Sequence, residues 1–179
     1  MKNITVLGSG NGTNFEALIA AGLPVTHIVC DNADALILEK AGKTGVYWSL
    51  SKQQDGETLQ EWGDDLIDII GDPDLVICAG FMKILPKNVC DVYHNKIINM
   101  HPSLLPKYAG STDAVYEGYK NTDTEFGVTI HHVTEELDGG PIILQRSFTI
   151  DSDVLLSDIQ KKIKKLEHEM IVEVVNSLI

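Results

Sequence analysis

Residues 4–30 read ITVLGSGNGTNFEALIAAGLPVTHIVC, which contains two short apolar runs separated by a glycine-rich turn and a polar, alanine-containing segment. The runs Ile4–Leu7 and Val25–Cys30 are rich in β-branched residues and too short for core helices, so they predict buried strands. The intervening segment Asn14–Ala21 has a helical pattern. Strand, helix and strand in this order predict two parallel strands joined by a helical crossover.

The same alternation continues to the end of the chain. Further strand-like runs are Leu75–Ala79, Ile97–Asn99, Gly127–Val133 and Ile142–Phe148. Helical patterns cover Ala33–Lys43, Glu57–Ile70, Pro86–Tyr93 and Thr112–Lys120, and a long amphipathic helix runs from Ser152 to about Val175, capped by Asp151 or Ser152. We therefore expect the fold class α/β, with one domain over residues 1–179 and a mainly parallel, twisted sheet flanked by helices.

The charge and cysteine content exclude several classes of function. The net charge of −12 disfavours a nucleic-acid partner and an anionic membrane surface, which both need a basic footprint. Three cysteines without CxxC spacing predict reduced thiols rather than a disulfide framework or a zinc site. No apolar stretch approaches the roughly 20 residues that span a bilayer. We expect a cytoplasmic protein that acts on small molecules, as a monomer or homodimer.

The first loop with a chemical pattern is Gly8–Asn14, which follows a predicted strand and opens a helix. Glycines allow close approach of the backbone to an anion, and the helix start supplies free N–H donors. An ordinary tight turn is one alternative. Another is a dinucleotide fingerprint with Asp31 on the ribose, although Thr13 stands where the third glycine is expected.

Two later loops carry groups suited to acyl transfer. Asn99 and His101 point to the same side of an extended segment, where an amide and a charged imidazole can together stabilise an oxyanion. Asp138, followed by Gly139-Gly140-Pro141, is a carboxylate on a shaped loop, and beside an imidazole it would favour the charged form. Each loop by itself also has a purely structural interpretation.

Four segments together resemble one family, in order along nearly the whole chain. They are Gly10-Asn11-Gly12-Thr13-Asn14, Ala79-Gly80-Phe81-Met82-Lys83-Ile84-Leu85, Asn99-Met100-His101-Pro102-Ser103-Leu104-Leu105-Pro106-Lys107-Tyr108 and Glu136-Leu137-Asp138-Gly139-Gly140-Pro141. The sequence resembles the glycinamide ribonucleotide formyltransferases, also called phosphoribosylglycinamide formyltransferases. The resemblance implies a Rossmann-like formyltransferase fold, with a substrate-phosphate loop in the N-terminal half and the catalytic and folate loops in the C-terminal half.

The resemblance also implies the reaction and the residues that perform it. A formyl group passes from 10-formyltetrahydrofolate, the co-substrate, to the amine of glycinamide ribonucleotide in de novo purine biosynthesis, without a metal. The implied catalytic residues are Asn99, His101 and Asp138. The implied substrate-binding residues are Gly12, Thr13, Asn14, Lys164 and Glu167, and the implied cofactor-binding residues are Met82, Lys83, Ile84, Leu85 and Asn99.

The sequence departs from the family pattern around the expected folate site. Lys83 stands where the family usually has Arg, the region around Glu57 lacks a basic residue, and Ser111-Thr112-Asp113 replaces a His-containing stretch. The alternatives are a folate-dependent N-formyltransferase acting on an amino sugar nucleotide, a hydrolase that releases formate from the folate, and a dinucleotide-binding oxidoreductase. The last would use Gly8–Gly12 and Asp31 and gives no role to Asn99 or Asp138.

Overall fold

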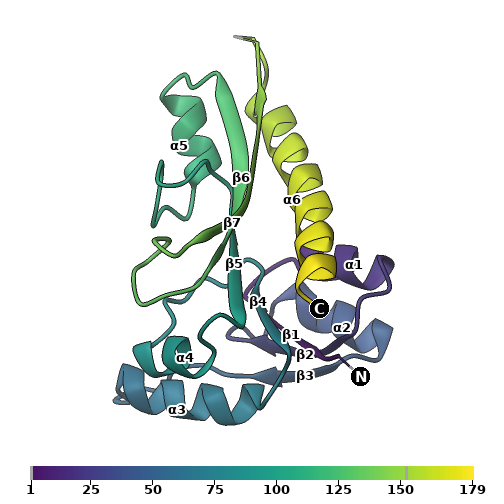
Figure 1. Cartoon of the computed structure of the whole chain (residues 1–179), viewed down its shortest axis with the longest axis vertical. Helices are drawn as coiled ribbons and strands as arrows, with labels where there is room; N and C mark the ends of the chain where they lie inside the picture. The colour runs from purple at the N-terminus through teal and green to yellow at the C-terminus, as the bar shows by residue number, and fades with distance from the viewer. Residues whose placement is uncertain (1, 152) are drawn as a thin grey trace.

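The computed structural model describes residues 2–151 and 153–179, which form an α/β fold around one seven-stranded sheet (Figure 1). The strands are β1 (Ile4–Gly8), β2 (Val25–Cys30), β3 (Tyr47–Leu50), β4 (Leu75–Cys78), β5 (Ile97–His101), β6 (Glu125–His132) and β7 (Ile142–Thr149). The helices are α1 (Thr13–Ala20), α2 (Leu36–Thr44), α3 (Leu59–Ile70), α4 (Lys87–Val92), α5 (Ala114–Lys120) and α6 (Leu156–Leu178).

The strand order in the sheet is β3-β2-β1-β4-β5-β6-β7. The five strands from β3 to β5 in this order pair in parallel, whereas β6 runs antiparallel to β5 and β7 antiparallel to β6. The expected α/β class and mainly parallel sheet are therefore confirmed. The strand order changes direction at β1, which lies between β2 and β4, and ligands of such sheets bind near the carboxyl ends at this point.

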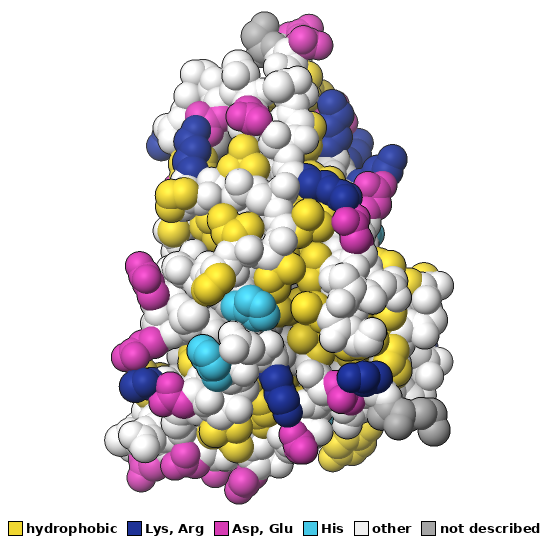
Figure 2. Space-filling model, viewed as in Figure 1, with side chains coloured by type: hydrophobic (Ala, Val, Ile, Leu, Met, Phe, Trp, Pro, Cys, Tyr) yellow, Lys and Arg dark blue, Asp and Glu magenta, His cyan; other side chains and the backbone are white. Residues whose placement is uncertain are grey.

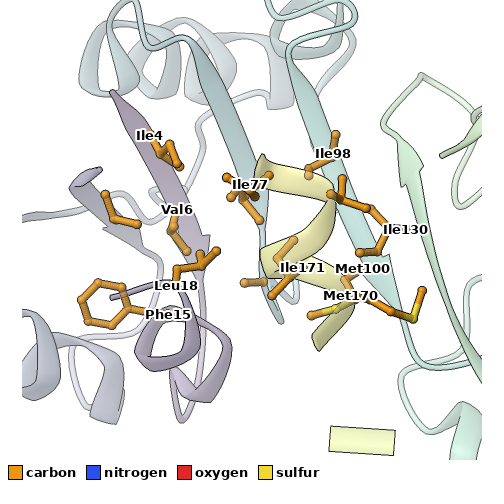
Figure 3. Packing of buried hydrophobic residues seen from close by; sticks show 14 of the residues in the cluster. Ile4, Val6, Phe15, Leu18, Ile77, Ile98, Met100, Ile130, Met170 and Ile171 are labelled. Atoms are coloured by element: carbon orange, nitrogen blue, oxygen red, sulfur yellow. The ribbon is translucent and has the colours of Figure 1, made fainter. Parts of the chain in front are cut away.

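The two faces of the sheet pack against different helices. Ile98 and Met100 belong to the core that includes residues of α1, α2 and α6 (Figure 3), whereas Ile97 belongs to the core with Trp62 of α3 and Val89 of α4. Since side chains alternate along a strand, Asn99 and His101 lie on the same side of β5 as Ile97. The apolar pattern of β5 thus determines which face carries the polar pair.

The last helix begins later than its sequence predicts. It starts at Leu156, and its N-cap is Leu155, which makes no side-chain cap, so the expectation that Asp151 caps it is wrong. The other predicted cap, Ser152, lies outside the described residues. The helix packs against α1 and β6, and Figure 1 shows it running beside the long β6–β7 ribbon.

The edge strand β3 was not predicted from the sequence. Its residues YWSL are mostly exposed, because β3 lies at the end of the sheet and pairs only with β2. With only four residues, β3 is too short and too exposed to show a period-two apolar pattern. The helix that follows is better marked: Thr58 and Glu61 form a reciprocal capping box at the start of α3.

Candidate active site

A cavity of about 460 Å³ opens at the carboxyl ends of β4, β5 and β6. Most of the residues singled out from the sequence line it: Asn14, Met82, Lys83, Ile84, Leu85, Asn99, His101, Asp138 and Glu167. Gly12, Thr13 and Lys164 do not line this cavity. Gly12 and Thr13 immediately precede Asn14, and Lys164 lies near Glu167 on α6. The sheet, the loop after β6 and the last helix thus bring together segments that are far apart in sequence.

His101 is held at both ring nitrogens. Its Nε2 lies 2.9 Å from the carbonyl oxygen of Tyr108, and because a carbonyl only accepts, this nitrogen carries the proton. Its Nδ1 lies 3.4 Å from Oδ2 of Asp138. Both ring nitrogens of His101 therefore face acceptor oxygens, one of a carbonyl and one of a carboxylate.

Asp138 is the acceptor that several groups share. Its Oδ2 accepts from the backbone N–H of Gly110 at 2.8 Å, and its Oδ1 accepts from the Asn99 amide at 3.2 Å. The pKa of Asp138 is lowered to about 2, chiefly by the hydrogen bond from His131, and further by Gly110 and the charge of His101, against the opposing effect of burial. Asp138 is therefore a stable anion at neutral pH.

His131 is a functional residue that the sequence analysis missed. It faces Asn99 directly in the β5–β6 pairing, and its Nε2 lies 3.5 Å from Oδ1 of Asp138. Its Nδ1 lies 2.9 Å from the carbonyl oxygen of His132 and must donate to it, so Nε2 is the nitrogen that faces the cluster. The sequence gives one indication of this role. Adjacent strand residues point to opposite faces, so only one of His131 and His132 can lie on the same face as Asn99.

Both hydrogens of the Asn99 amide have partners within this cluster. The amide nitrogen lies 3.2 Å from Asp138 Oδ1 and 3.2 Å from His131 Nε2. Neutral His131 accepts one of these hydrogens, whereas protonated His131 has no lone pair for it and donates to Asp138 instead. The protonation of His131 therefore determines whether Asn99 has a hydrogen available for another acceptor.

The glycine loop is shaped by α2. Gly12 is the N-cap of α1 with a φ of 68°, and a Cβ there would lie 2.7 Å from Cγ1 of Ile37. The backbone N–H of Ile37 donates to Gly10, and Lys40 donates to the carbonyl oxygen of Asn11 at 2.6 Å. Two loop carbonyls are thus directed toward α2, which leaves the helix start to offer its N–H groups to an anion.

Asn14 and Glu167 form the other polar end of the cavity. Burial raises the pKa of Glu167 to about 7, although a hydrogen bond with Asn14 and the charge of Lys164 both act to lower it. The side-chain oxygen of Asn14 is buried and has no hydrogen-bond partner within residues 2–151 and 153–179. These two side chains can therefore still receive polar groups of a ligand.

The segment from Met82 to Leu85 presents apolar side chains to solvent at the cavity. Met82 and Ile84 line the cavity and are 59% and 64% exposed, although large apolar side chains are usually buried. The backbone N–H of Met82 donates to the hydroxyl of Ser9 at 2.8 Å, which links this segment to the glycine loop. An apolar ring system would cover these side chains.

Figure 2 shows hydrophobic side chains gathered in the middle of one face, with acidic side chains spread around its margin. In the described part of the chain, no group of three or more His, Cys, Asp or Glu side chains is arranged to hold a metal ion. Of the helices described, none is both long and apolar enough to cross a membrane.

Comparisons with known proteins agree with this geometry. A family model described as formyl transferase matches residues 2–175. The phosphoribosylglycinamide formyltransferase of Bacillus subtilis is 32% identical over 100% of this chain and 95% of its own length. The Escherichia coli enzyme of the same name is 36% identical over 93% of this chain and 82% of its own length.

Solved structures give the same result. The crystal structure of phosphoribosylglycinamide formyltransferase from Streptococcus pneumoniae superimposes with a TM-score of 0.93 at 30% identity, covering 99% of both chains. The resemblance inferred from the four segments is therefore confirmed, and neither an amino-sugar enzyme nor an oxidoreductase is favoured. The chain belongs to the formyl transferase family, and within it to the phosphoribosylglycinamide formyltransferases.

Proposed function

We propose that this chain transfers the formyl group of 10-formyltetrahydrofolate to the amine of glycinamide ribonucleotide, giving formylglycinamide ribonucleotide and tetrahydrofolate in de novo purine biosynthesis. The observation that carries the proposal is the cluster of Asn99, His101 and Asp138 on one side of one cavity. In this proposal residues 1–179 act as one formyltransferase domain.

The two ends of the cavity suit the two substrates. The ribonucleotide is anionic and carries hydroxyl groups, which match the helix start at Gly12 and Thr13 and the side chains of Asn14 and Glu167. Lys164 adds a positive charge beside Glu167. This end would therefore hold the ribonucleotide, as the family resemblance implies.

The exposed segment at the other end suits the folate. Met82, Ile84 and Leu85 supply apolar cover for a pterin ring, and the backbone groups of the segment can read the polar edge of that ring. Lys83 would supply charge where the family usually has Arg, without the planar fork of a guanidinium. Between the two ends lies the polar cluster, where the formyl group meets the amine.

The chemistry follows from the charges that develop. The substrate amine forms a bond to the formyl carbon, and the carbonyl oxygen becomes an oxyanion. The charge of protonated His101, whose two N–H groups face Tyr108 and Asp138, and the amide of Asn99 stabilise this oxygen, and an oxyanion-hole donor is typically worth a few kcal/mol. The bond from the formyl carbon to N10 of the folate then breaks, the amine loses one proton and N10 gains one.

Asp138 acts on this step in two ways. Its carboxylate, with a pKa near 2, remains charged and favours the charged form of His101. In this proposal Asp138 also lies beside the reacting groups and helps a water molecule to relay the proton from the amine to N10.

We further infer that the protein works in the cytoplasm as a monomer or homodimer, on small molecules rather than on nucleic acid or membranes. The net charge of −12 and the three buried free cysteines, Cys30, Cys78 and Cys90, support this inference. Size-exclusion chromatography with light scattering distinguishes the two oligomeric states.

A direct assay tests the proposed function. The purified protein is incubated with glycinamide ribonucleotide and 10-formyltetrahydrofolate, and both the folate absorbance and the mass of the product are followed. We expect formylglycinamide ribonucleotide and tetrahydrofolate in equal amounts. Formation of formate without formylated product would instead indicate a hydrolase, and no turnover of the folate would contradict the proposal.

A further inference from the structure

One short loop segment contacts both members of the His101–Asp138 pair. The carbonyl oxygen of Tyr108 accepts from His101 Nε2 at 2.9 Å, and the N–H of Gly110 donates to Asp138 Oδ2 at 2.8 Å. The same carboxylate oxygen lies 3.4 Å from His101 Nδ1. Residues 108–110 therefore set the distance and the relative orientation of the imidazole and the carboxylate.

This segment has a backbone conformation that needs support from elsewhere. Tyr108 has a φ of 60° and Gly110 a φ of 75°, and the left-handed region is unfavourable for a non-glycine residue. The tyrosine must keep this conformation if its carbonyl oxygen is to face His101. The backbone N–H of Ser111 donates to this carbonyl at 3.2 Å, and a second anchor lies outside the cavity.

Asp123 is this second anchor. It lies between α5 and β6, outside the lining of the cavity, and its Oδ2 accepts from the hydroxyl of Tyr108 at 2.8 Å. Lys107 donates to the same oxygen at 2.6 Å, and Asn121 donates to the Tyr108 hydroxyl at 3.0 Å. The tyrosine ring thus links a carboxylate in the α5–β6 turn to a carbonyl at the catalytic histidine.

The sheltered bond of this network is the one to Tyr108. The side chain of Asp123 is 15% exposed and that of Lys107 is 54% exposed, so the lysine is largely solvated and its ion pair contributes little. A hydrogen bond to an ionised acceptor in a sheltered position is stronger than one between neutral groups. The bond between Tyr108 and Asp123 is therefore the sheltered, charge-assisted contact that ties the loop to the α5–β6 turn.

We infer that Asp123 is a positioning residue for the formyl transfer, and that it orients His101 and Asp138 through the ring of Tyr108 and the backbone of residues 108–110. The inference rests on the proposed function for its effect on turnover. Its effect on His101 is independent of that function. When the anchor is removed, the Tyr108 carbonyl keeps the hydrogen bond from Ser111 N–H but loses the support of its own side chain, so the hydrogen bond that it accepts from His101 Nε2 becomes weaker.

The test compares Tyr108→Phe, Asp123→Ala and Asp123→Asn with the wild-type protein. Tyr108→Phe keeps the ring and removes only the anchoring hydroxyl, and Asp123→Asn keeps an oxygen that can accept from Tyr108. Glu173→Gln is the matched control, because it breaks the ion pair of Glu173 with Arg146 at 2.7 Å between α6 and β7, away from the cavity lining.

We expect Tyr108→Phe and Asp123→Ala to lower kcat about tenfold, since small displacements of catalytic groups have large effects, with the KM of both substrates within about twofold of wild type. Asp123→Asn recovers most of this loss. The second readout is the imidazole Nε2–H signal of His101 in histidine-labelled protein, identified by its absence in His101→Ala. In Tyr108→Phe and Asp123→Ala this signal shifts and exchanges faster with solvent, and in Glu173→Gln it does not.

Each result has one meaning. An unchanged kcat and an unchanged His101 signal in Tyr108→Phe would overturn the inference, and so would a loss of kcat without any change in that signal. If Asp123→Ala does not fold, Tyr108→Phe decides by the same two readouts. If the wild type shows no transferase activity, the proposed function fails, and the His101 signal alone then supports or overturns the positioning role.

Discussion

Asn99 and His131 face each other across β5 and β6, and the Asn99 amide nitrogen lies 3.2 Å from His131 Nε2. The same histidine also contacts Asp138 and is the main cause of the low pKa of that carboxyl group. His131 therefore couples the amide that is proposed to bind the oxyanion to the carboxylate that is proposed to keep His101 charged.

The adjacent histidines allow a matched comparison. We expect His131→Ala to lower kcat by about tenfold or more, because Asn99 and Asp138 both lose the partner that orients them. His132→Ala serves as the control, since His132 does not line the cavity. Steady-state kinetics of the two variants checks this prediction, and equal kcat values in both would mean that His131 has no role in turnover.

The oxyanion donors themselves should have the largest effect. His101→Ala and Asn99→Ala are each expected to lower kcat about a hundredfold or more, because the first removes a charge and the second a donor that act most strongly on the oxyanion of the transition state. Circular dichroism should show intact folds. Near-wild-type turnover in a well-folded variant of either residue would rule out its assigned role.

Removing the charge of Asp138 while keeping its shape tests its electrostatic role. Asp138→Asn should lower kcat by orders of magnitude and leave both KM values nearly unchanged, since the carboxylate acts on His101 rather than on substrate binding. Measuring kcat and KM for both substrates separates the outcomes. A rise in the folate KM with kcat preserved would mean that Asp138 only shapes the folate loop.

Two glycines of the first loop should respond differently to a methyl group. Gly12→Ala places a Cβ 2.7 Å from Ile37 at a φ of 68°, so we expect Tm to fall by about 2–8 °C. The KM for the ribonucleotide should rise much more than that for the folate, because the start of α1 is displaced. A Cβ at Gly10 meets nothing within 4 Å, so Gly10→Ala should leave Tm unchanged. Equal increases in both KM values of Gly12→Ala would contradict a phosphate-binding loop.

Glu167 should make stability depend on pH. Its folded pKa of about 7 lies above the usual value of 4.5, so between these values the folded state binds more protons than the unfolded state. The free energy of unfolding therefore falls as pH rises through this window, by at most ~3 kcal/mol. Glu167→Gln should remove this fall in urea unfolding at pH 5 and pH 8.

The neighbouring helix residue Glu169 supplies the control for that experiment. It is exposed on α6, and Glu169→Gln changes the net charge by the same amount. Titration of the other groups is common to both variants and cancels in the comparison. If Glu167→Gln and Glu169→Gln show the same dependence of the free energy of unfolding on pH, Glu167 is not held in a buried position in solution.

The sequence by itself determined the local features of this protein. Alternation along Ile97–His101 places Asn99 and His101 on one side of β5, because neighbouring side chains of a strand point to opposite faces. The glycine loop after β1 is likewise local, since glycine readily adopts the left-handed φ of 68° found at Gly12. The strands with buried apolar runs were also predictable, because these runs are visible in the sequence, whereas the exposed edge strand β3 was not predicted.

Only the tertiary structure decided which distant groups meet. Period-two alternation identifies the side of a strand but not its neighbour, so the antiparallel pairing that sets His131 against Asn99 depends on how the whole sheet buries its faces. Glu167 enters the cavity because α6 packs across the sheet onto α1 and β6, and the Tyr108–Asp123 anchor forms because α5 ends beside the loop after β5. Such contacts come from packing between elements, and no pattern within one element specifies them.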